Sequence, residues 1–147
     1  MIPNNENVAR AIFSPKMVIS GEIMPEAFRL RESINEDYLS VMRISIPTWI
    51  DDIKSIPQHK SRKLFDFAEM NVGEIRSIKL NNVSYDVCEC NNNSTLSHAG
   101  IFITIDGQKL IGGKTIDMPE SEIEQDFLLL AIQRELVDIA QKGLYII

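Results

Sequence analysis

The chain has 147 residues, of which 44% are hydrophobic and 24% charged, a balance typical of a folded domain and not of a disordered one. Its 15 basic and 21 acidic residues give a formal net charge of −6, which argues against nucleic acid as a partner. No apolar run approaches the roughly 18 residues of a membrane span, and the start MIPNNENV lacks a signal-peptide pattern. We expect a cytoplasmic protein with no membrane partner, built as a loose arm (residues 1–7) and a single domain (residues 8–147).

Short β-prone segments dominate the first third of the chain. Residues 8–13 predict a strand that ends at Ser14-Pro15, because proline cannot donate to a ladder. Residues 16–19 predict a second short strand. The segment 25–30 is compatible with one helical turn begun by Pro25 or with an irregular loop. Residues 38–46 then alternate in the manner of a strand, and Pro47 closes it.

The middle of the chain carries two helix signals. Thr48 and Asp51 match the capping-box spacing, which predicts a short helix to about residue 53. A second helix is predicted over residues 57–70, because Leu64, Phe67 and Ala68 would share one face of it.

Strand signals follow this second helix. Residues 74–80 and 83–90 flank Asn81-Asn82, a pattern that predicts a β-hairpin. Residues 98–105 predict another strand, and residues 109–111 its hairpin partner after the Asp106-Gly107 turn.

The C-terminal region predicts one long helix. Asp117 is a candidate N-cap, and Gly143 is well placed just beyond the last turn. An apolar stripe that includes Ile123 and Phe127 predicts a largely buried helix, followed by a short strand at residues 144–147. The whole pattern predicts an α+β fold: a largely antiparallel sheet with two short helices and one long C-terminal helix packed on it.

The two cysteines, Cys88 and Cys90, are expected to be reduced thiols. On a strand their Cα atoms would lie about 6.5–7 Å apart, near the outer limit for an unstrained disulfide. Together with His98 and His59 they resemble a zinc ligand set only weakly, because C-x-C with one following histidine lacks the spacing of structural zinc sites. We expect no metal and no cofactor.

Four polar residues stand in or beside segments that otherwise resemble a protein core: Arg10, Ser40, Arg43 and His98. His98 opens a β-prone strand directly after a polar loop, where an imidazole can contact a ligand, act as a general base or simply hydrogen-bond a carbonyl. Two converging arginines would hold a phosphate or carboxylate, whereas Arg43 alone would pair with Glu36 or Asp37. We predict that these four residues border one ligand-binding pocket, and no catalytic residue is assigned.

Several motifs resemble a set of small bacterial proteins of unassigned function: R-A-I-F at residues 10–13, G-E-I-M-P-E-A-F at 21–28, L-S-V-M-R at 39–43 and H-A-G-I-F at 98–102. The chain is also distantly similar to ADP-ribosyltransferase-like folds, which place an arginine or histidine on an early strand, a serine on a following strand and a glutamate near the end. Arg10 and Ser40 match the first two positions. The third has no match, since Glu135 falls in the predicted helix.

The leading functional expectation is a bacterial intracellular domain that binds a partner protein or a small anionic ligand through the pocket lined by arginine, serine and histidine. The alternative is an enzyme acting on a nucleotide or another phosphorylated substrate, as the second resemblance implies. A third expectation, which rests only on the family resemblance, is a subunit of a toxin–antidote or defence locus. The residues alone leave open whether the protein is an enzyme.

Overall fold

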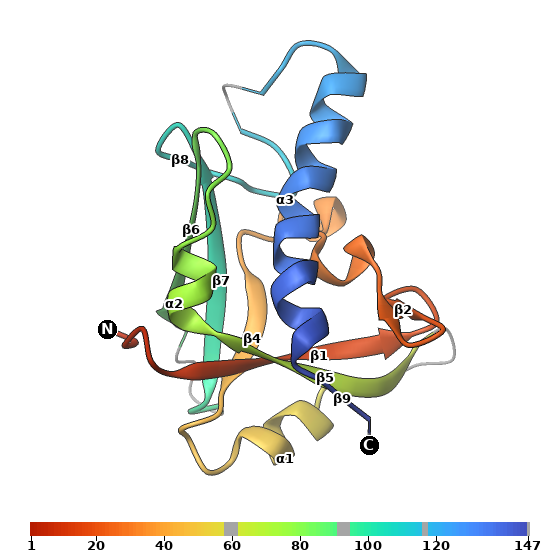
Figure 1. Ribbon diagram of the computed structural model, residues 1–147, viewed down its shortest axis with the longest axis vertical. Helices are drawn as coiled ribbons and strands as arrows, with labels where there is room; N and C mark the ends of the chain where they lie inside the picture. Colours follow the sequence, from red (N-terminus) through yellow and green to blue (C-terminus); the bar gives the residue numbers. More distant parts are fainter. Residues whose placement is uncertain (58–61, 91–94, 116–117, 147) are drawn as a thin grey trace.

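The computed structural model describes residues 1–57, 62–90, 95–115 and 118–146. The described residues form a seven-stranded antiparallel sheet, in which six strands follow the order β6-β7-β4-β1-β5-β9 and β8 pairs with β7 (Figure 1). The strands of this sheet are β1 (Asn7–Ser14), β4 (Leu39–Arg43), β5 (Lys63–Asn71), β6 (Val83–Glu89), β7 (His98–Ile105), β8 (Gln108–Lys109) and β9 (Leu144–Ile146). Two further short strands, β2 (Val18–Ile19) and β3 (Glu22–Ile23), pair with each other in a separate ribbon.

The helices of the described residues comprise two short ones and one long one. They are α1 (Trp49–Lys54), α2 (Val72–Arg76) and α3 (Glu122–Lys142), and single 3-10 turns occur at η1 (Pro25–Phe28) and η2 (Glu32–Ile34). The α+β fold predicted from the sequence is therefore confirmed. None of these helices combines the length and the apolarity needed to cross a bilayer.

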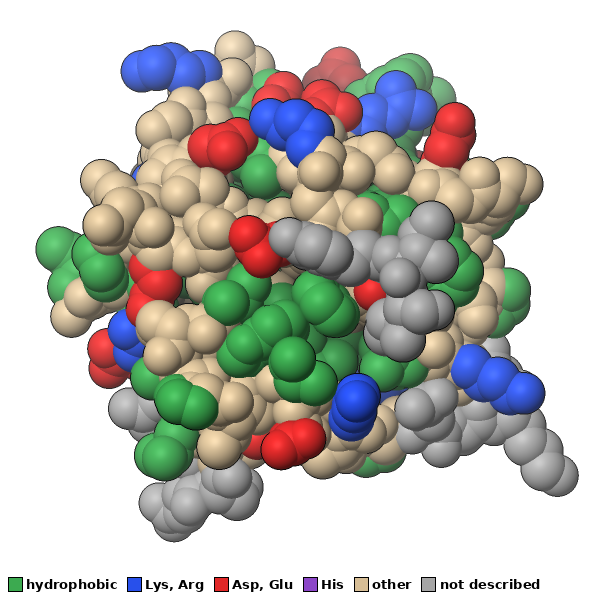
Figure 2. All heavy atoms as spheres, turned by 60° about the horizontal axis from the view of Figure 1, so that its bottom comes forward, with side chains coloured by type: hydrophobic (Ala, Val, Ile, Leu, Met, Phe, Trp, Pro, Cys, Tyr) green, Lys and Arg blue, Asp and Glu red, His purple; other side chains and the backbone are tan. Residues whose placement is uncertain are grey.

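Strand β1 lies inside the sheet and contributes to an apolar core on each side of it. Because side chains alternate along a strand, Val8 and Ile12 face the core that α3 covers, whereas Ala9, Ala11 and Phe13 face the smaller core under α1. Figure 2 brings the α1 side of the molecule forward and shows apolar side chains gathered there. The cavity described below lies beside this smaller core.

The helix predicted over residues 57–70 is wrong, because the described part of that segment contains β5. Asp66, Ala68 and Met70 are buried with the period of two that a strand requires. The helical spacing of Leu64 and Phe67 gave the wrong prediction, since a buried aspartate interrupted the alternation of apolar residues. Strand β5 pairs with the whole length of β1.

The first arm of the hairpin predicted around Asn81-Asn82 is also wrong. Residues 72–76 form α2 instead, and the Asn71 side chain caps this helix by accepting a hydrogen bond of 2.9 Å from the backbone N–H of Glu74. The second arm is confirmed as β6, which pairs with β7 along its length.

Helix α3 is buried over only part of its length. Ile132, Leu136 and Ala140 pack into the core, but Ile123 is 68% and Phe127 69% exposed, so the prediction of a largely buried stripe is wrong at those two positions. The first turns of the helix project beyond the strands (Figure 1). The predicted N-cap at 117 lies outside the described residues, and the described helix begins after Ser121.

Residues 1–7 are anchored to the domain and do not form the loose arm expected from the sequence. Ile2 is only 1% exposed and belongs to the main core. Arg76 Nη1 donates hydrogen bonds of 2.7 Å to the Ile2 carbonyl and to Asn4 Oδ1. These contacts hold the N-terminal segment against α2.

Candidate functional site

The sheet divides where β1 and β4 stop pairing. The two strands pair with each other only at Val8–Arg43 and Ala9–Met42. Beyond these two pairs, β1 remains paired with β5, and β4 remains paired with β7. Arg10 lies at this division. Its Nη1 donates a hydrogen bond of 2.8 Å to the Ser40 carbonyl, in the place where a ladder bond would otherwise lie.

The same guanidinium also connects the strands to η1. Arg10 Nε and Nη2 donate to the Ala27 carbonyl at 3.1 and 2.8 Å. Burial lowers the pKa of Arg10 to about 10, with Glu36 acting in the opposite direction and Arg31 and Arg62 adding to the decrease. The side chain therefore stays charged at neutral pH, and the guanidinium groups of Arg31 and Arg62 are near enough to disfavour its charge.

A cavity of about 810 Å³ opens beside the division, and we call it the fork cavity. The apolar part of its lining, which we call its floor, includes the buried residues of the smaller core: Ala9, Ala11, Phe13, Met42 and Ile53. Two alanines in succession on one face of β1 leave space that larger side chains would fill. These two small side chains add to the space of the fork cavity.

Ser40 and His98 meet in the lining of the fork cavity. Met42 pairs directly with His98, and Ser40, two residues before Met42, points to the same face of the sheet. Ser40 Oγ consequently lies 3.1 Å from His98 Nε2. The Tyr38 ring packs against the imidazole, with ring centroids 5.7 Å apart, and so restricts its orientation.

The imidazole of His98 is held in a neutral state at pH 7. Burial lowers its pKa, and a hydrogen bond with the Cys90 backbone partly opposes this shift. The Nε2 atom of this ring faces the serine hydroxyl.

The charged lining of the fork cavity is predominantly basic. Five of these side chains are basic and three acidic: Arg10, Lys16, Arg29, Arg31 and Arg62 against Glu26, Glu32 and Glu36. Each acid already has a basic partner. Glu26 pairs with Arg29 at 3.6 Å, Glu36 with Arg31 at 2.9 Å, and Glu32 with Lys114, which lies outside the lining, also at 2.9 Å.

Arg62 is the basic side chain of this lining that has a buried donor without a partner among the described residues. Its guanidinium lies over the Phe13 ring, 4.2 Å from the centroid, and Nη2 makes one long hydrogen bond of 3.4 Å to the Pro57 carbonyl. Its Nε is buried without a hydrogen-bond partner among the described residues. An unsatisfied buried donor costs roughly 1–3 kcal/mol, which an anionic ligand would recover.

Three of the four residues predicted to border a pocket line the fork cavity, namely Arg10, Ser40 and His98. Arg43 does not line it. Its guanidinium bonds the Glu6 carboxylate at 2.9 and 3.0 Å and lies 3.3 Å from Glu89, so it pairs with neither of the acids suggested by the sequence. The prediction of free thiols at Cys88 and Cys90 is confirmed.

Sequence reasoning missed Lys16 and Arg62 as lining residues. Arg62 lies in the segment 57–70 for which a helix was predicted, and it lines the cavity because the residues after it form β5. The alternation F-D-F-A-E-M at residues 65–70 was the available signal. No sequence signal indicated that Lys16 would line the cavity, since its position depends on the turn between β1 and β2.

These features define an α+β domain with a basic, apolar-floored cavity where its sheet divides. No family model, curated protein or solved structure matches the chain. The resemblances to small bacterial proteins and to ADP-ribosyltransferase-like folds therefore stay predictions. Glu135 lies on α3 and is not among the residues that line the fork cavity.

Proposed function

We propose that this protein binds a small organic anion in the fork cavity. One observation supports this most directly: among the described residues, Arg10, Lys16 and Arg62 line the cavity without an acidic partner within 4 Å. The chain as a whole has a formal net charge of −6, so the basic lining of the cavity has the opposite sign to the net charge of the protein. Basic side chains beside low-dielectric walls concentrate anions at such a place.

The ligand is expected to have an apolar part and an anionic part. A volume of about 810 Å³ falls within the range of small-molecule sites, and the apolar floor would accept a hydrocarbon or ring. The anionic group is a phosphate or a carboxylate, because guanidinium forks bind both in the same bidentate geometry.

A small ligand is better supported than a partner protein. The unsatisfied Nε of Arg62 is buried and the Arg10 guanidinium lies at the division of the sheet, so both are out of reach for a flat protein surface. A small molecule can enter the cavity and reach these donors. The proposal therefore commits to the small ligand.

Thermal unfolding with an anion panel tests this function. The panel contains inorganic phosphate, nucleoside monophosphates, sugar phosphates, and aliphatic mono- and dicarboxylates. An anion at ten times its Kd stabilises the folded state by about 1.4 kcal/mol and raises Tm by roughly 3–6 °C. The phosphate and carboxylate series separate the two chemistries.

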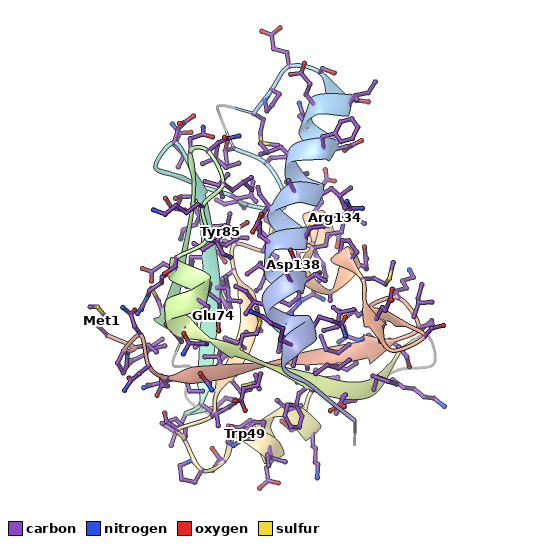
Figure 3. The ribbon with its side chains drawn as sticks, viewed as in Figure 1. Met1, Trp49, Glu74, Tyr85, Arg134 and Asp138 are labelled. Atoms are coloured by element: carbon purple, nitrogen blue, oxygen red, sulfur yellow. The ribbon has the colours of Figure 1, made fainter. Side chains whose placement is uncertain are left out.

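The matched variants are Arg62→Ala in the cavity and Arg134→Ala, an exposed arginine on α3 (Figure 3). We expect Arg62→Ala to weaken binding at least tenfold and Arg134→Ala to leave it unchanged. The proposal is overturned if no anion raises Tm, or if both variants bind with the affinity of the original protein.

A further inference from the structure

The contact between Ser40 and His98 has the geometry of a nucleophile and its general base. Ser40 Oγ and His98 Nε2 are 3.1 Å apart, within the range required for proton transfer. For this transfer the neutral imidazole carries its proton on Nδ1 and its lone pair on Nε2, which faces the serine hydroxyl. The Tyr38 ring, with its centroid 5.7 Å from that of the imidazole, restricts the orientation of the base.

We propose that Ser40 is an acyl-accepting nucleophile, that His98 is its general base, and that the substrate is a carboxylic ester bearing an anionic group. This inference rests on the proposed function, because the basic side chains of the fork cavity would hold that group. The reaction class is hydrolysis through an acyl-serine intermediate.

Arg10 is assigned the stabilisation of the negative charge that develops on the substrate carbonyl oxygen. Its Nη1 is bonded to the carbonyl of Ser40 itself, which places the guanidinium beside the nucleophilic residue. Three of its five N–H groups donate to the Ala27 and Ser40 carbonyls, so two remain for an oxyanion. Those donors are fixed before the substrate binds, the condition under which charge stabilisation lowers a barrier most.

The proposed steps are as follows. Ser40 Oγ bonds to the ester carbonyl carbon as its proton passes to His98 Nε2, and the resulting oxyanion is stabilised by Arg10. The carbon–oxygen bond to the alcohol then breaks, and the alcohol takes the proton from Nε2. A water molecule attacks the acyl-serine, His98 accepts its proton and returns it to Ser40 Oγ, and the carboxylic acid leaves.

The floor of the fork cavity fits the acyl portion of such a substrate. Ala9, Ala11 and Met42 line it on the face of the sheet from which Ser40 projects. An acyl chain on this floor would bring its carbonyl carbon to the serine, and the anionic group would reach Arg62 and Lys16. The substrate thus needs a hydrocarbon part between the ester and the charge.

Two probes test the chemistry. A fluorescent fluorophosphonate is expected to label the protein on Ser40, located by peptide mass spectrometry. The mono-p-nitrophenyl ester of glutaric acid is expected to be hydrolysed at least tenfold faster, in kcat/KM, than p-nitrophenyl acetate, since only the former carries a carboxylate.

The variants separate chemistry from binding. Ser40→Ala should abolish labelling and reduce turnover at least a thousandfold, while the thermal shift with glutarate remains. His98→Gln should reduce kcat, and Arg62→Ala should raise KM with little change in kcat. Ser84→Ala, an exposed serine on β6, is the control for a serine outside the cavity and should behave as the original protein.

The two proposals fail in different ways. Unlabelled Ser40, or full turnover in Ser40→Ala, overturns the catalytic role; a retained glutarate shift then leaves the binding function intact. Turnover that depends on Ser40 but shows no preference for the anionic ester overturns the anion subsite. Circular dichroism of each variant confirms that the loss of activity is not a loss of fold.

Discussion

The Arg43 guanidinium holds the Glu6 carboxylate through two hydrogen bonds of 2.9 and 3.0 Å, and thereby joins the segment before β1 to the end of β4. The two side chains are only 17% and 9% exposed, so water screens the pair weakly. Arg43, expected in a ligand pocket, is thus a structural residue in the fold.

Arg43→Ala should lower the free energy of unfolding by roughly 1.5–3 kcal/mol, the usual cost of removing hydrogen bonds to a charged group. Urea denaturation measures this. Arg31→Ala is the matched control, because its pair with Glu36 is formed by an arginine that is 58% exposed, and it should cost less than about 1 kcal/mol. Equal costs for the two variants would contradict the structural role of Arg43.

The same pair makes stability depend on pH in the acid range. Burial raises the pKa of Glu6, but the hydrogen bonds from Arg43 and Ser45 outweigh it, and the net pKa lies below 4.5. A carboxylate with a depressed pKa stabilises the fold above its unfolded pKa and ceases to do so as pH falls through the folded pKa. Stability should therefore fall below about pH 4.5, and Glu6→Gln should show a shallower decrease in urea titrations.

His98 should add a second pH dependence, nearer neutrality. Burial lowers its pKa below 6.5, so the folded state resists the charged form more than the unfolded chain does. The contribution of neutral His98 to the stability of the folded state is therefore fully present above pH 6.5. It decreases as the pH falls from 6.5 through the pKa that His98 has in the folded state. His98→Gln should flatten this region of the stability curve, and proton NMR of the imidazole gives the pKa directly. A folded pKa at or above 6.5 would refute this.

Tyr85 connects β6 to the middle of α3. Its hydroxyl donates a buried hydrogen bond of 2.8 Å to the Ile132 carbonyl, and Figure 3 shows the side chain between the strands and the helix. Tyr85→Phe removes the donor with little change of shape, and should cost about 1 kcal/mol in urea denaturation. Burial also raises the pKa of this phenol far above its usual range, so the native protein should show no ionisation of Tyr85 at pH 10–11. An unchanged stability in Tyr85→Phe would mean that the helix carbonyl finds another donor.

Gly143 ends α3 in close contact with β5. A Cβ there would lie 2.0 Å from the Glu69 carbonyl oxygen, whose position is held because the Glu69 N–H donates to the Gly143 carbonyl at 2.8 Å. Gly143→Ala should therefore cost more than about 3 kcal/mol through overpacking against backbone. Gly107→Ala is the control: its Cβ would meet nothing within 4 Å, and only its φ of +78° is unfavourable, at about 1–2 kcal/mol. A smaller loss at Gly143 than at Gly107 would show that β5 can shift.

Most of the strands were predictable because their residues are strongly β-prone and their ends are marked by proline, glycine or asparagine. The predictions failed where burial depended on a distant element. Asp66 is buried in β5, although nothing near it in the sequence indicates why. Phe127 is exposed because the sheet does not extend to the first turns of α3, a fact about the neighbouring strands and not about the helix.

By its own residues the sequence determined the fold class, the long terminal helix and three residues of the candidate site, because propensity and alternation are local properties. Only the tertiary structure decided that Arg43 pairs with Glu6, that Arg62 reaches Phe13, and that the sheet divides at Arg10. The register between strands far apart in the chain sets those contacts. A cavity is the space that such strands leave between them, which no single segment encodes.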